Sequence, residues 1–231
     1  MKKQITHFIV IYTLLLACVG WLVFSFIIQP PSPEQIFRDH LRTVVEVRAF
    51  NDESVKAFGS AVAINSDGLF ITNAHVISIR QDQVFETIQI RFATDEDFID
   101  ATFYRKDRDI DLALIKVDAI NINIRPAIIR TGTLNEGETV FAIGNGQNYG
   151  ISIKNGIISQ RELIVVADGR TITAIQCALN ITSGNSGGAL LDSRGRLIGI
   201  TTFRLRDQAG QTIFGTSFAI PIRIMQGFLN S

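Results

Sequence analysis

Short runs in which apolar and polar residues alternate recur along most of the chain, separated by glycine, asparagine, aspartate or serine residues. Alternation with a period of two is typical of strands that bury one face. The runs fall into two sets, and the expected strands are 43–50, 57–64, 69–73, 87–93, 99–105 and 111–117, then 139–143, 151–159, 163–167, 171–178, 197–203 and 213–220. This pattern predicts an all-β fold of two six-stranded antiparallel barrels, closed by a short helix at 222–229.

The N-terminal segment breaks this pattern, because residues 8–28 are mostly apolar and none of them is charged. A helix of this length can cross a hydrocarbon core of about 30 Å. Lys2 and Lys3 precede it and no basic residue follows until Arg38, so the positive-inside rule places the N-terminus in the cytoplasm. The expected organisation is a cytoplasmic leader at 1–7, a single-pass type II transmembrane anchor at 8–28, a linker at 29–40 and a folded domain at 41–231. The folded domain would then lie in the periplasm or outside the cell.

Three other interpretations of residues 8–28 stay open. A cleaved signal peptide has a shorter apolar region and a small-residue cleavage site, which the end of this run at 26–30 lacks. Residues 15–18 resemble a lipoprotein cleavage box, but a mature chain starting at Cys18 would keep ten more apolar residues beside its lipid. A buried core helix is disfavoured by the terminal position and by the proline-rich residues 30–33, which predict a stiff spacer.

The charge of the chain is balanced, with 22 Lys and Arg against 22 Asp and Glu. Basic and acidic residues are interspersed, so no nucleic-acid partner is expected. The cysteines, Cys18 and Cys177, fall in the expected membrane helix and in the folded domain, and no disulfide is expected between them. No Cys/His cluster has the spacing of metal ligands, and we expect neither a metal nor an organic cofactor.

One serine stands in a turn built by glycines, in the stretch Gly-Asn-Ser-Gly-Gly at 184–188. Glycine permits a tight backbone in which the amides of Gly184 and Ser186 can point at one spot, as in an oxyanion hole. Taken alone, such a cluster fits an ordinary turn between two strands equally well. The stretch therefore indicates a nucleophile only if a base and its orienting acceptor are also present.

A serine nucleophile needs a base within hydrogen-bond reach. Among the three histidines, His7 lies in the charged leader and His40 in a mixed polar segment, and both are interpreted as solvated. His75 follows the apolar run 69–74 at the end of an expected strand. It is the candidate base, and the alternative is an ordinary histidine at a strand end.

The base in turn needs a shielded carboxylate. Asp111 opens the alternating run 111–117, where its side chain can reach inward. Its competitors, Asp107 and Asp109, lie in the charged stretch 105–109, which is typical of a solvated loop. Asp111 is therefore the candidate orienting residue.

These residues occur in the order His75, Asp111, Ser186, and the stretches around them resemble the HtrA (Deg) branch of the trypsin-like serine proteases. The stretches that carry the resemblance are Thr-Asn-Ala-His-Val at 72–76, Asp-Leu-Ala-Leu-Ile-Lys-Val at 111–117, Phe-Ala-Ile-Gly-Asn at 141–145, Gly-Asn-Ser-Gly-Gly-Ala-Leu at 184–190 and Phe-Ala-Ile-Pro at 218–221. The resemblance extends over about residues 41–224. It implies a trypsin-like fold with the active site in the cleft between the barrels.

The resemblance also implies a role for each residue. Ser186 would attack the scissile carbonyl, His75 would carry its proton to the leaving amine, and Asp111 would orient the imidazole. The amides of Gly184 and Ser186 would stabilise the tetrahedral oxyanion. Members of the family act on misfolded or regulatory polypeptides, so the expected partners are polypeptide substrates.

Two stretches depart from the family pattern. Residues 177–183 read Cys-Ala-Leu-Asn-Ile-Thr-Ser, where family members usually carry Thr-Asp-Ala-Ala-Ile-Asn-Pro. This stretch resembles a wall of the pocket for the residue before the cut. Its candidate pocket residues, Leu179, Asn180 and Ile181, predict cleavage after small aliphatic side chains. The usual Gly-Asn-Pro-Phe-Gly loop is altered at 144–150, with no consequence that the sequence predicts.

Regulation is also expected to follow the family. Zymogen proteases carry an aspartate at the position of Asn185, which pairs with a newly cut N-terminus, and a neutral amide cannot form that ion pair. Loop rearrangement driven by peptide or oligomer contacts is expected instead. Family members usually continue into PDZ domains and form trimers, whereas this sequence ends about ten residues after 218–221. The expectation is therefore a protein without a PDZ domain that forms a homotrimer.

Two classes of function follow. The first is a membrane-anchored serine endopeptidase, favoured because the triad, the glycine turn and the barrel pattern agree. The second is a non-hydrolytic polypeptide-binding or scaffold protein of the same fold, which would use the altered stretch 177–183. An esterase is a third alternative, because acyl-enzyme chemistry does not by itself distinguish amides from esters.

Overall fold

The computed structural model describes residues 7, 11–21, 29–52, 57–79, 83–167, 170–202 and 215–230. The chain divides into two compact units, Met1–Pro31 and Ser32–Ser231. Residues 11–21 of the first unit form a helix. Within the described ranges, no helix combines the length and the apolar character needed to cross a membrane. Residues 8–10 and 22–28 of the expected anchor lie outside those ranges.

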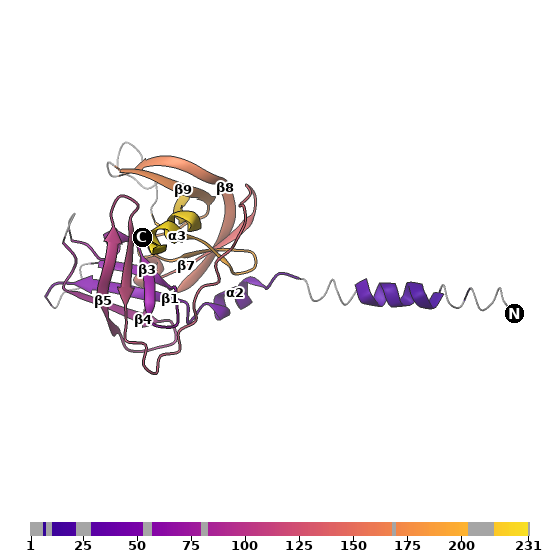
Figure 1. The fold of residues 1–231 in the computed structure, drawn as a ribbon, viewed down its shortest axis with the longest axis horizontal. Coiled ribbons are helices and arrows are strands. Elements are labelled where there is room, and N and C mark those ends of the chain that lie inside the picture. Colours follow the sequence, from indigo (N-terminus) through magenta and orange to yellow (C-terminus); the bar gives the residue numbers. More distant parts are fainter. Residues whose placement is uncertain are drawn as a thin grey trace. The chain divides into compact units, whose positions relative to one another are not determined.

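The first six strands of the second unit form a closed barrel. They are β1 (Val44–Phe50), β2 (Ala57–Ala63), β3 (Leu69–Thr72), β4 (Thr87–Phe92), β5 (Ile99–Asp107) and β6 (Leu112–Lys116). Their order around the barrel is β1-β2-β3-β6-β5-β4, and the neighbouring pairs are antiparallel (Figure 1). In β4 the side chains alternate between half-buried and buried, and Ile88, Ile90 and Phe92 enter the barrel core. This is the period of two that the sequence predicts.

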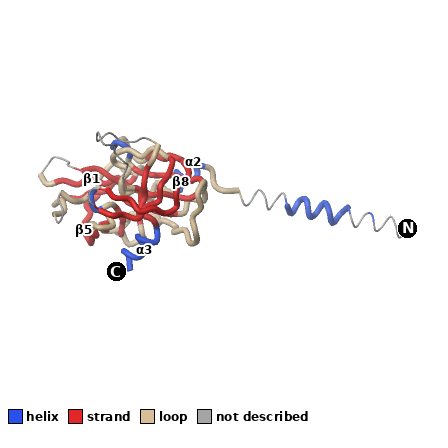
Figure 2. Tube along the Cα trace, turned by 90° about the horizontal axis from the view of Figure 1, so that it is seen from above, coloured by secondary structure: helices blue, strands red, loops and turns tan. Residues whose placement is uncertain are grey.

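The last six strands form a second closed barrel, which confirms the predicted pair. They are β7 (Thr139–Gly144), β8 (Ser152–Ala167), β9 (Arg170–Ala178), β10 (Ala189–Asp192), β11 (Leu197–Thr201) and β12 (Ser217–Pro221). Their order is β10-β11-β12-β9-β8-β7, again with antiparallel neighbours. Figure 2 shows the strands at the centre of this unit, with loops around them and the C-terminal helix at its edge.

Two details of the second barrel correct the strands expected from sequence. The runs 151–159 and 163–167 are one continuous strand, β8, because two register shifts against β9 each absorb one extra residue of β8. The barrel still has six strands, because it contains a strand that the sequence did not predict. This strand, β10, has only four residues and directly follows the glycine turn around Ser186. A run of four consecutive buried residues shows no alternation, so the periodic pattern missed it.

Helices flank the two barrels. The expected helix at 222–229 is confirmed as α3 (Ile222–Asn230), which buries Met225 and Phe228. Residues 33–39, within the expected linker, form the short helix α2 (Pro33–Asp39). The Ser32 hydroxyl caps α2 by accepting from the Gln35 amide at 3.2 Å, and a proline occupies its first position. Ile36 of α2 is 1% exposed, so this helix belongs to the folded domain.

A hydrophobic core joins the barrels. One cluster of buried side chains combines residues from α2, from both barrels and from α3, and includes Ile36, Val44, Val62, Ile71, Leu112, Leu114, Phe141, Ile143, Leu191, Ile200 and Met225. Separate clusters fill the interior of each barrel. Because the side chains of the shared cluster are as buried as those of the two barrel cores, residues on the facing edges of the barrels are held in fixed relative positions.

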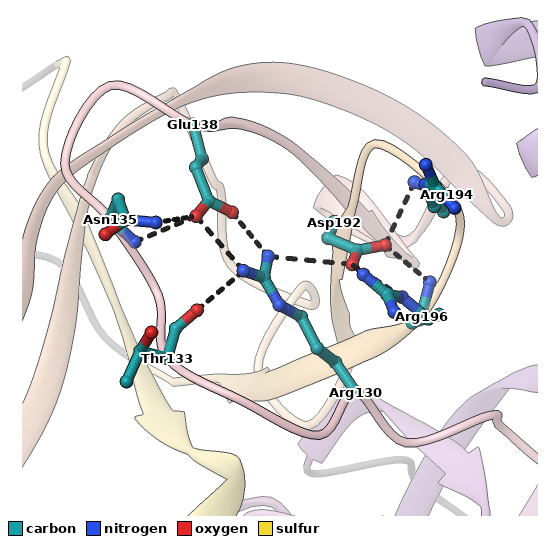
Figure 3. Close-up of polar contacts among 7 residues, drawn as sticks. All are labelled: Arg130, Thr133, Asn135, Glu138, Asp192, Arg194 and Arg196. Atoms are coloured by element: carbon teal, nitrogen blue, oxygen red, sulfur yellow. Dashed lines mark hydrogen bonds and ion pairs between the residues drawn. The ribbon is translucent and has the colours of Figure 1, made fainter. Parts of the chain in front are cut away.

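A polar cluster fastens the segment between the barrels to the second barrel (Figure 3). The Arg130 guanidinium forms an ion pair with Glu138, donates to the Thr133 carbonyl at 2.6 Å and lies 3.6 Å from the Asp192 carboxylate. Asp192 also accepts from the Arg196 side chain, at 2.8 Å. The hydrogen bond from Arg130 lowers the pKa of Glu138 to about 2, against a smaller opposing effect of burial. This cluster lies at the end of β10 opposite Ser186, so its contribution is to stability rather than to the candidate site.

Candidate active site

The structure brings His75 and Asp111 together at the edge of the first barrel. His75 lies in the 3-10 turn η1 (Ala74–Val76), which is separated from β3 by one residue, and Asp111 immediately precedes β6. His75 Nδ1 is 2.8 Å from Asp111 Oδ2, and the His75 backbone amide donates to Asp111 Oδ1 at 3.1 Å. Asp111 is 1% exposed, whereas the His75 side chain is 45% exposed. A buried carboxylate therefore holds the Nδ1 edge of an imidazole that is partly open to solvent.

The Asp111 carboxyl stays ionised despite its burial. Burial raises its pKa, but the hydrogen bonds and charge of His75 and a hydrogen bond from Thr202 outweigh it, so the pKa lies below the ordinary value. The competing carboxylate of Asp107 instead accepts from the amide of Asp109 at 2.9 Å, inside its own turn. Of the three carboxylates considered from sequence, Asp111 is the one whose described contacts include His75.

Two residues that sequence reasoning did not select hold Asp111. Its backbone lies in the left-handed region, at φ +56°, which is costly for a residue other than glycine. The Asp111 carbonyl accepts from Asn73 Nδ2 at 2.9 Å and from the Ala74 amide at 3.2 Å. The Thr202 hydroxyl donates to Asp111 Oδ2 at 2.9 Å, across the interface between the barrels. Asn73 belongs to a motif visible in the sequence, but nothing in the sequence marks Thr202.

Ser186 lies in the turn that precedes β10, where Gly184 and Gly187 have φ of +92° and +84°. A Cβ at Gly184 would lie 2.1 Å from the Asn145 carbonyl oxygen, so only glycine fits there. Within the described ranges, the amides of Gly184 and Ser186 donate to no other group. Both amides are therefore available to an oxyanion.

The Ser186 hydroxyl donates to the Thr202 carbonyl, at 2.7 Å. Among the described residues, no hydrogen bond joins this hydroxyl to His75. Thr202 consequently contacts both halves of the site, through its carbonyl to Ser186 and through its hydroxyl to Asp111. The link between nucleophile and base requires a rotation of the Ser186 side chain about χ1.

The expected pocket residues have two different environments. Leu179 and Ile181 are each 4% exposed and pack in the core of the second barrel. Asn180 is exposed, and its Oδ1 accepts from the Gly215 amide at 2.6 Å. The alternation of β9 continues past its end, and this turns the two apolar side chains inward. Residues 203–214, which follow Thr202, lie outside the described ranges.

Other reactive groups have no arrangement for chemistry in the described ranges. No group of three or more His, Cys, Asp and Glu side chains there is placed to hold a metal ion. Cys177 is buried in the second barrel, and burial raises the pKa of its thiol to about 12. This thiol is therefore protonated and shielded at neutral pH.

Residues 59–200 match the family model described as a trypsin-like peptidase domain. The chain is 36% identical over 182 residues to the serine endoprotease DegS of Haemophilus influenzae, an alignment that covers 78% of this chain and 51% of that protein. It is 34% identical over 203 residues to DegS of Escherichia coli, covering 84% of this chain and 52% of that protein. The chain thus spans about half the length of these curated relatives.

Solved structures of the same type of protease are also similar to this chain. A serine endoprotease from Yersinia pestis superposes with a TM-score of 0.69 at 30% identity, covering 87% of this chain and 66% of that chain. A variant of the HtrA-type protease AlgW with a tripeptide superposes with a TM-score of 0.71 at 28% identity, covering 87% of this chain and 63% of that chain. The similarity therefore extends over both barrels.

Proposed function

The chain belongs to the trypsin-like peptidase family and to its HtrA/Deg type, and we propose that it is a serine endopeptidase. The observation that carries the proposal is the 2.8 Å contact between His75 and the buried Asp111, next to a serine in a glycine turn. This is the constellation that acyl transfer requires, namely an oriented base, a nucleophile and free backbone amides.

In the proposed reaction, Ser186 turns from the Thr202 carbonyl toward His75 Nε2 and attacks the scissile carbonyl as His75 takes its proton. The amides of Gly184 and Ser186 stabilise the oxyanion, an effect worth about 2.7–4 kcal/mol for one donor. Ionised Asp111 stabilises the imidazolium that forms. His75 then protonates the leaving amine, and water releases the acyl group by the same steps in reverse.

The geometry around Ser186 supports a resting state that substrate converts to the active one. The hydrogen bond to the Thr202 carbonyl must break before the hydroxyl reaches His75. A neutral hydrogen bond of this kind contributes about 0.5–1.5 kcal/mol net, so the energy of substrate binding is sufficient to replace it. We do not expect activation by a new N-terminus. Asn185 is neutral, and its side-chain amide donates to the carbonyl and hydroxyl of Thr182.

The physiological substrates are proposed to be misfolded or regulatory polypeptides cut after small aliphatic residues, by a homotrimer. Support for the side-chain preference is the apolar character of Leu179 and Ile181 and the lack of any charged residue in the stretch 177–183. Sequencing the products of a peptide library tests the preference, and the mass of the purified assembly tests the trimer. A basic or acidic residue before the cut contradicts the first proposal.

The protein is further proposed to be a single-pass type II membrane protein whose catalytic domain lies in the periplasm or outside the cell. Support comes from the 21 uncharged residues at 8–28 and from the two lysines that precede them. Extraction of membranes with carbonate and accessibility of the domain to added protease test it. Release of the chain by carbonate, or protection of the domain in cells whose outer membrane and wall have been removed, would show this topology to be wrong.

The second candidate function is non-hydrolytic binding of polypeptides, and it is favoured by the engagement of the Ser186 hydroxyl with Thr202. The two functions are separated by reaction of the detergent-purified full-length chain with a fluorophosphonate, followed by intact mass. A single adduct that is absent from Ser186→Ala and His75→Ala is expected for an endopeptidase. No adduct on the folded wild type, with or without added peptide, supports the binding function.

A further inference from the structure

Glu46 is a buried carboxylate of the first barrel that the proposed mechanism does not use. It lies on β1 opposite Arg91 of β4 and is 4% exposed. Glu46 Oε2 accepts from the Arg91 guanidinium at 3.1 Å and from Asn145 Nδ2 at 3.2 Å. A buried carboxylate is costly unless such donors compensate it. The first contact stays within the barrel, but the second crosses to the second barrel.

Asn145 is fully buried at the end of β7, and each of its polar groups is used. The backbone amide of Asn145 donates to the Ser60 hydroxyl at 2.8 Å, and its side-chain Oδ1 accepts from the Gly150 backbone amide at 2.9 Å. Asn145 Nδ2 donates to Glu46 and also to Asn148 Oδ1, at 3.1 Å, and this orientation of the side-chain amide leaves Oδ1 for Gly150. Glu46 thereby ties the loop 145–150, the stretch that departs from the family pattern, to the first barrel.

This loop contacts the backbone beside the nucleophile. The Gln147 amide donates to the Ser183 carbonyl at 2.6 Å, and the Ser60 hydroxyl, which accepts from Asn145, donates to the Gly184 carbonyl at 2.8 Å. The Ser183–Gly184 peptide bond is trans, so its carbonyl and its N–H point in opposite directions. Holding the Ser183 carbonyl toward the loop therefore directs the Gly184 N–H away from it.

We infer that Glu46 and Asn145 are positioning residues for the Gly184 amide of the oxyanion hole, an inference that rests on the proposed endopeptidase function. Glu46 orients Asn145, and Asn145 orients both the Ser60 hydroxyl and the loop that binds Ser183. Asp111, which contacts His75, is held by Asn73 and Thr202, whereas Glu46 and Asn145 act on the oxyanion loop. The contacts form one continuous series from the first barrel to the oxyanion loop.

The pairing of the two side chains gives a test by exchange. Asn145→Asp places a second carboxylate beside Glu46, and Glu46→Gln removes the charge while keeping the shape. In the double variant Glu46→Gln/Asn145→Asp the amide and the carboxylate exchange places, so one donor again meets one acceptor. Double-mutant cycles of this kind isolate the coupling between two contacting residues.

Two readouts are measured on the detergent-purified full-length chain. The first is the amide resonance of Gly184 in ¹⁵N-glycine-labelled protein, which reports its orientation whether or not the protein is active. The second is peptide hydrolysis, with the rate of labelling by a fluorophosphonate. We expect Asn145→Asp to shift the Gly184 resonance and to lower kcat about tenfold or more, with KM changed less than about twofold. The double variant should recover most of both changes.

The matched control is Glu138→Gln, because that carboxylate also binds an arginine and an asparagine but lies in the distal cluster. It should lower thermal stability and leave the Gly184 resonance in place. An unchanged resonance in both single variants, or a double variant no better than Asn145→Asp, overturns the inference. If the resonance follows the pairing while the wild type is never labelled, the proposed endopeptidase function fails and the positioning role stands. If Asn145→Asp does not fold, Glu46→Gln with and without Asn145→Asp decides between these outcomes.

Discussion

The Ser186 hydroxyl donates to the carbonyl of Thr202 at 2.7 Å, while the hydroxyl of the same threonine donates to Asp111 at 2.9 Å. One residue of the second barrel therefore holds the nucleophile of its own barrel and the carboxylate of the other. The first contact opposes the link to His75, and the second supports the charge that the reaction needs. Thr202 accordingly affects both the resting geometry and the catalytic one.

Thr202→Val removes the hydroxyl and keeps the carbonyl and the shape of the side chain. The Thr202 hydrogen bond lowers the pKa of Asp111, so its loss raises that pKa and leaves the carboxylate less able to orient His75 and to stabilise its imidazolium. We expect kcat/KM to fall about tenfold, which corresponds to about 1.4 kcal/mol. Thr202→Ser restores the hydroxyl and should restore kcat/KM. An unchanged kcat/KM in Thr202→Val contradicts this role.

Asp111→Asn keeps the size of the side chain and removes its charge. The amide permits the wrong tautomer of His75 and cannot stabilise an imidazolium, so kcat should fall by about 10⁴. The matched control is Asp107→Asn, since Asp107 caps only its own turn and should leave kcat unchanged. Steady-state hydrolysis by the two variants measures the difference. Equal losses in both variants would show that the choice of carboxylate is wrong.

Gly184→Ala tests the backbone of the oxyanion turn. The new Cβ would lie 2.1 Å from the Asn145 carbonyl oxygen, at a φ of +92°, so the turn must move and the Gly184 amide with it. Labelling of Ser186 by a fluorophosphonate should slow by about 10² or more. Gly132→Ala has a comparable φ of +100° but open space around it, so it is the control for backbone strain alone. Labelling as slow in Gly132→Ala as in Gly184→Ala would attribute the loss to general destabilisation.

Glu138→Gln tests the distal polar cluster and its pH dependence. The Glu138 pKa is lowered to about 2 in the folded protein from 4.5, so this group stabilises the fold above the unfolded pKa. That contribution is lost as the pH falls from about 4.5 toward 2. At pH 7 we expect Glu138→Gln to cost about 1.5–3 kcal/mol of unfolding free energy. Urea unfolding at pH 7 and pH 3 measures it, and a penalty of equal size at both values contradicts the ion-pair explanation.

How far the sequence predicts the fold depends on how local each signal is. The alternation of Thr87–Phe92 identifies β4 because side chains on a strand face opposite sides in turn. The same reasoning divided β8 in two, since an extra residue in a bulge interrupts the alternation without ending the pairing. It also placed α2 in a linker, although Ser32 and Pro33 form a typical helix start. Tertiary pairing overrode the local pattern in β8, whereas the start signal of α2 was already present in the sequence.

In the candidate site, too, some features follow from local sequence and others only from tertiary contacts. Leu179 and Ile181 are predicted as pocket residues from their place in a motif, and the structure shows that both pack in the core of the second barrel, so their role in a pocket stays a prediction. Position in a motif identifies neighbours along the chain, whereas the inward direction of these two side chains follows from the alternation of β9, which continues past its end. The altered loop at 144–150 had no predicted consequence, because its partners Glu46 and Ser60 come from the first barrel.

The sequence by itself determined the two barrels, the glycine turn around Ser186 and the choice of His75 and Asp111 as candidates. These depend on periodicity, on the conformational freedom of glycine and on residue chemistry, all of which are readable within a few neighbouring positions. Only the tertiary structure decided that Thr202 supports Asp111, that Ser186 faces Thr202, and that Glu46 reaches Asn145. These contacts join residues 16 to 99 positions apart. A hydrogen bond requires two groups at one distance and one angle, and only the packed barrels bring them there.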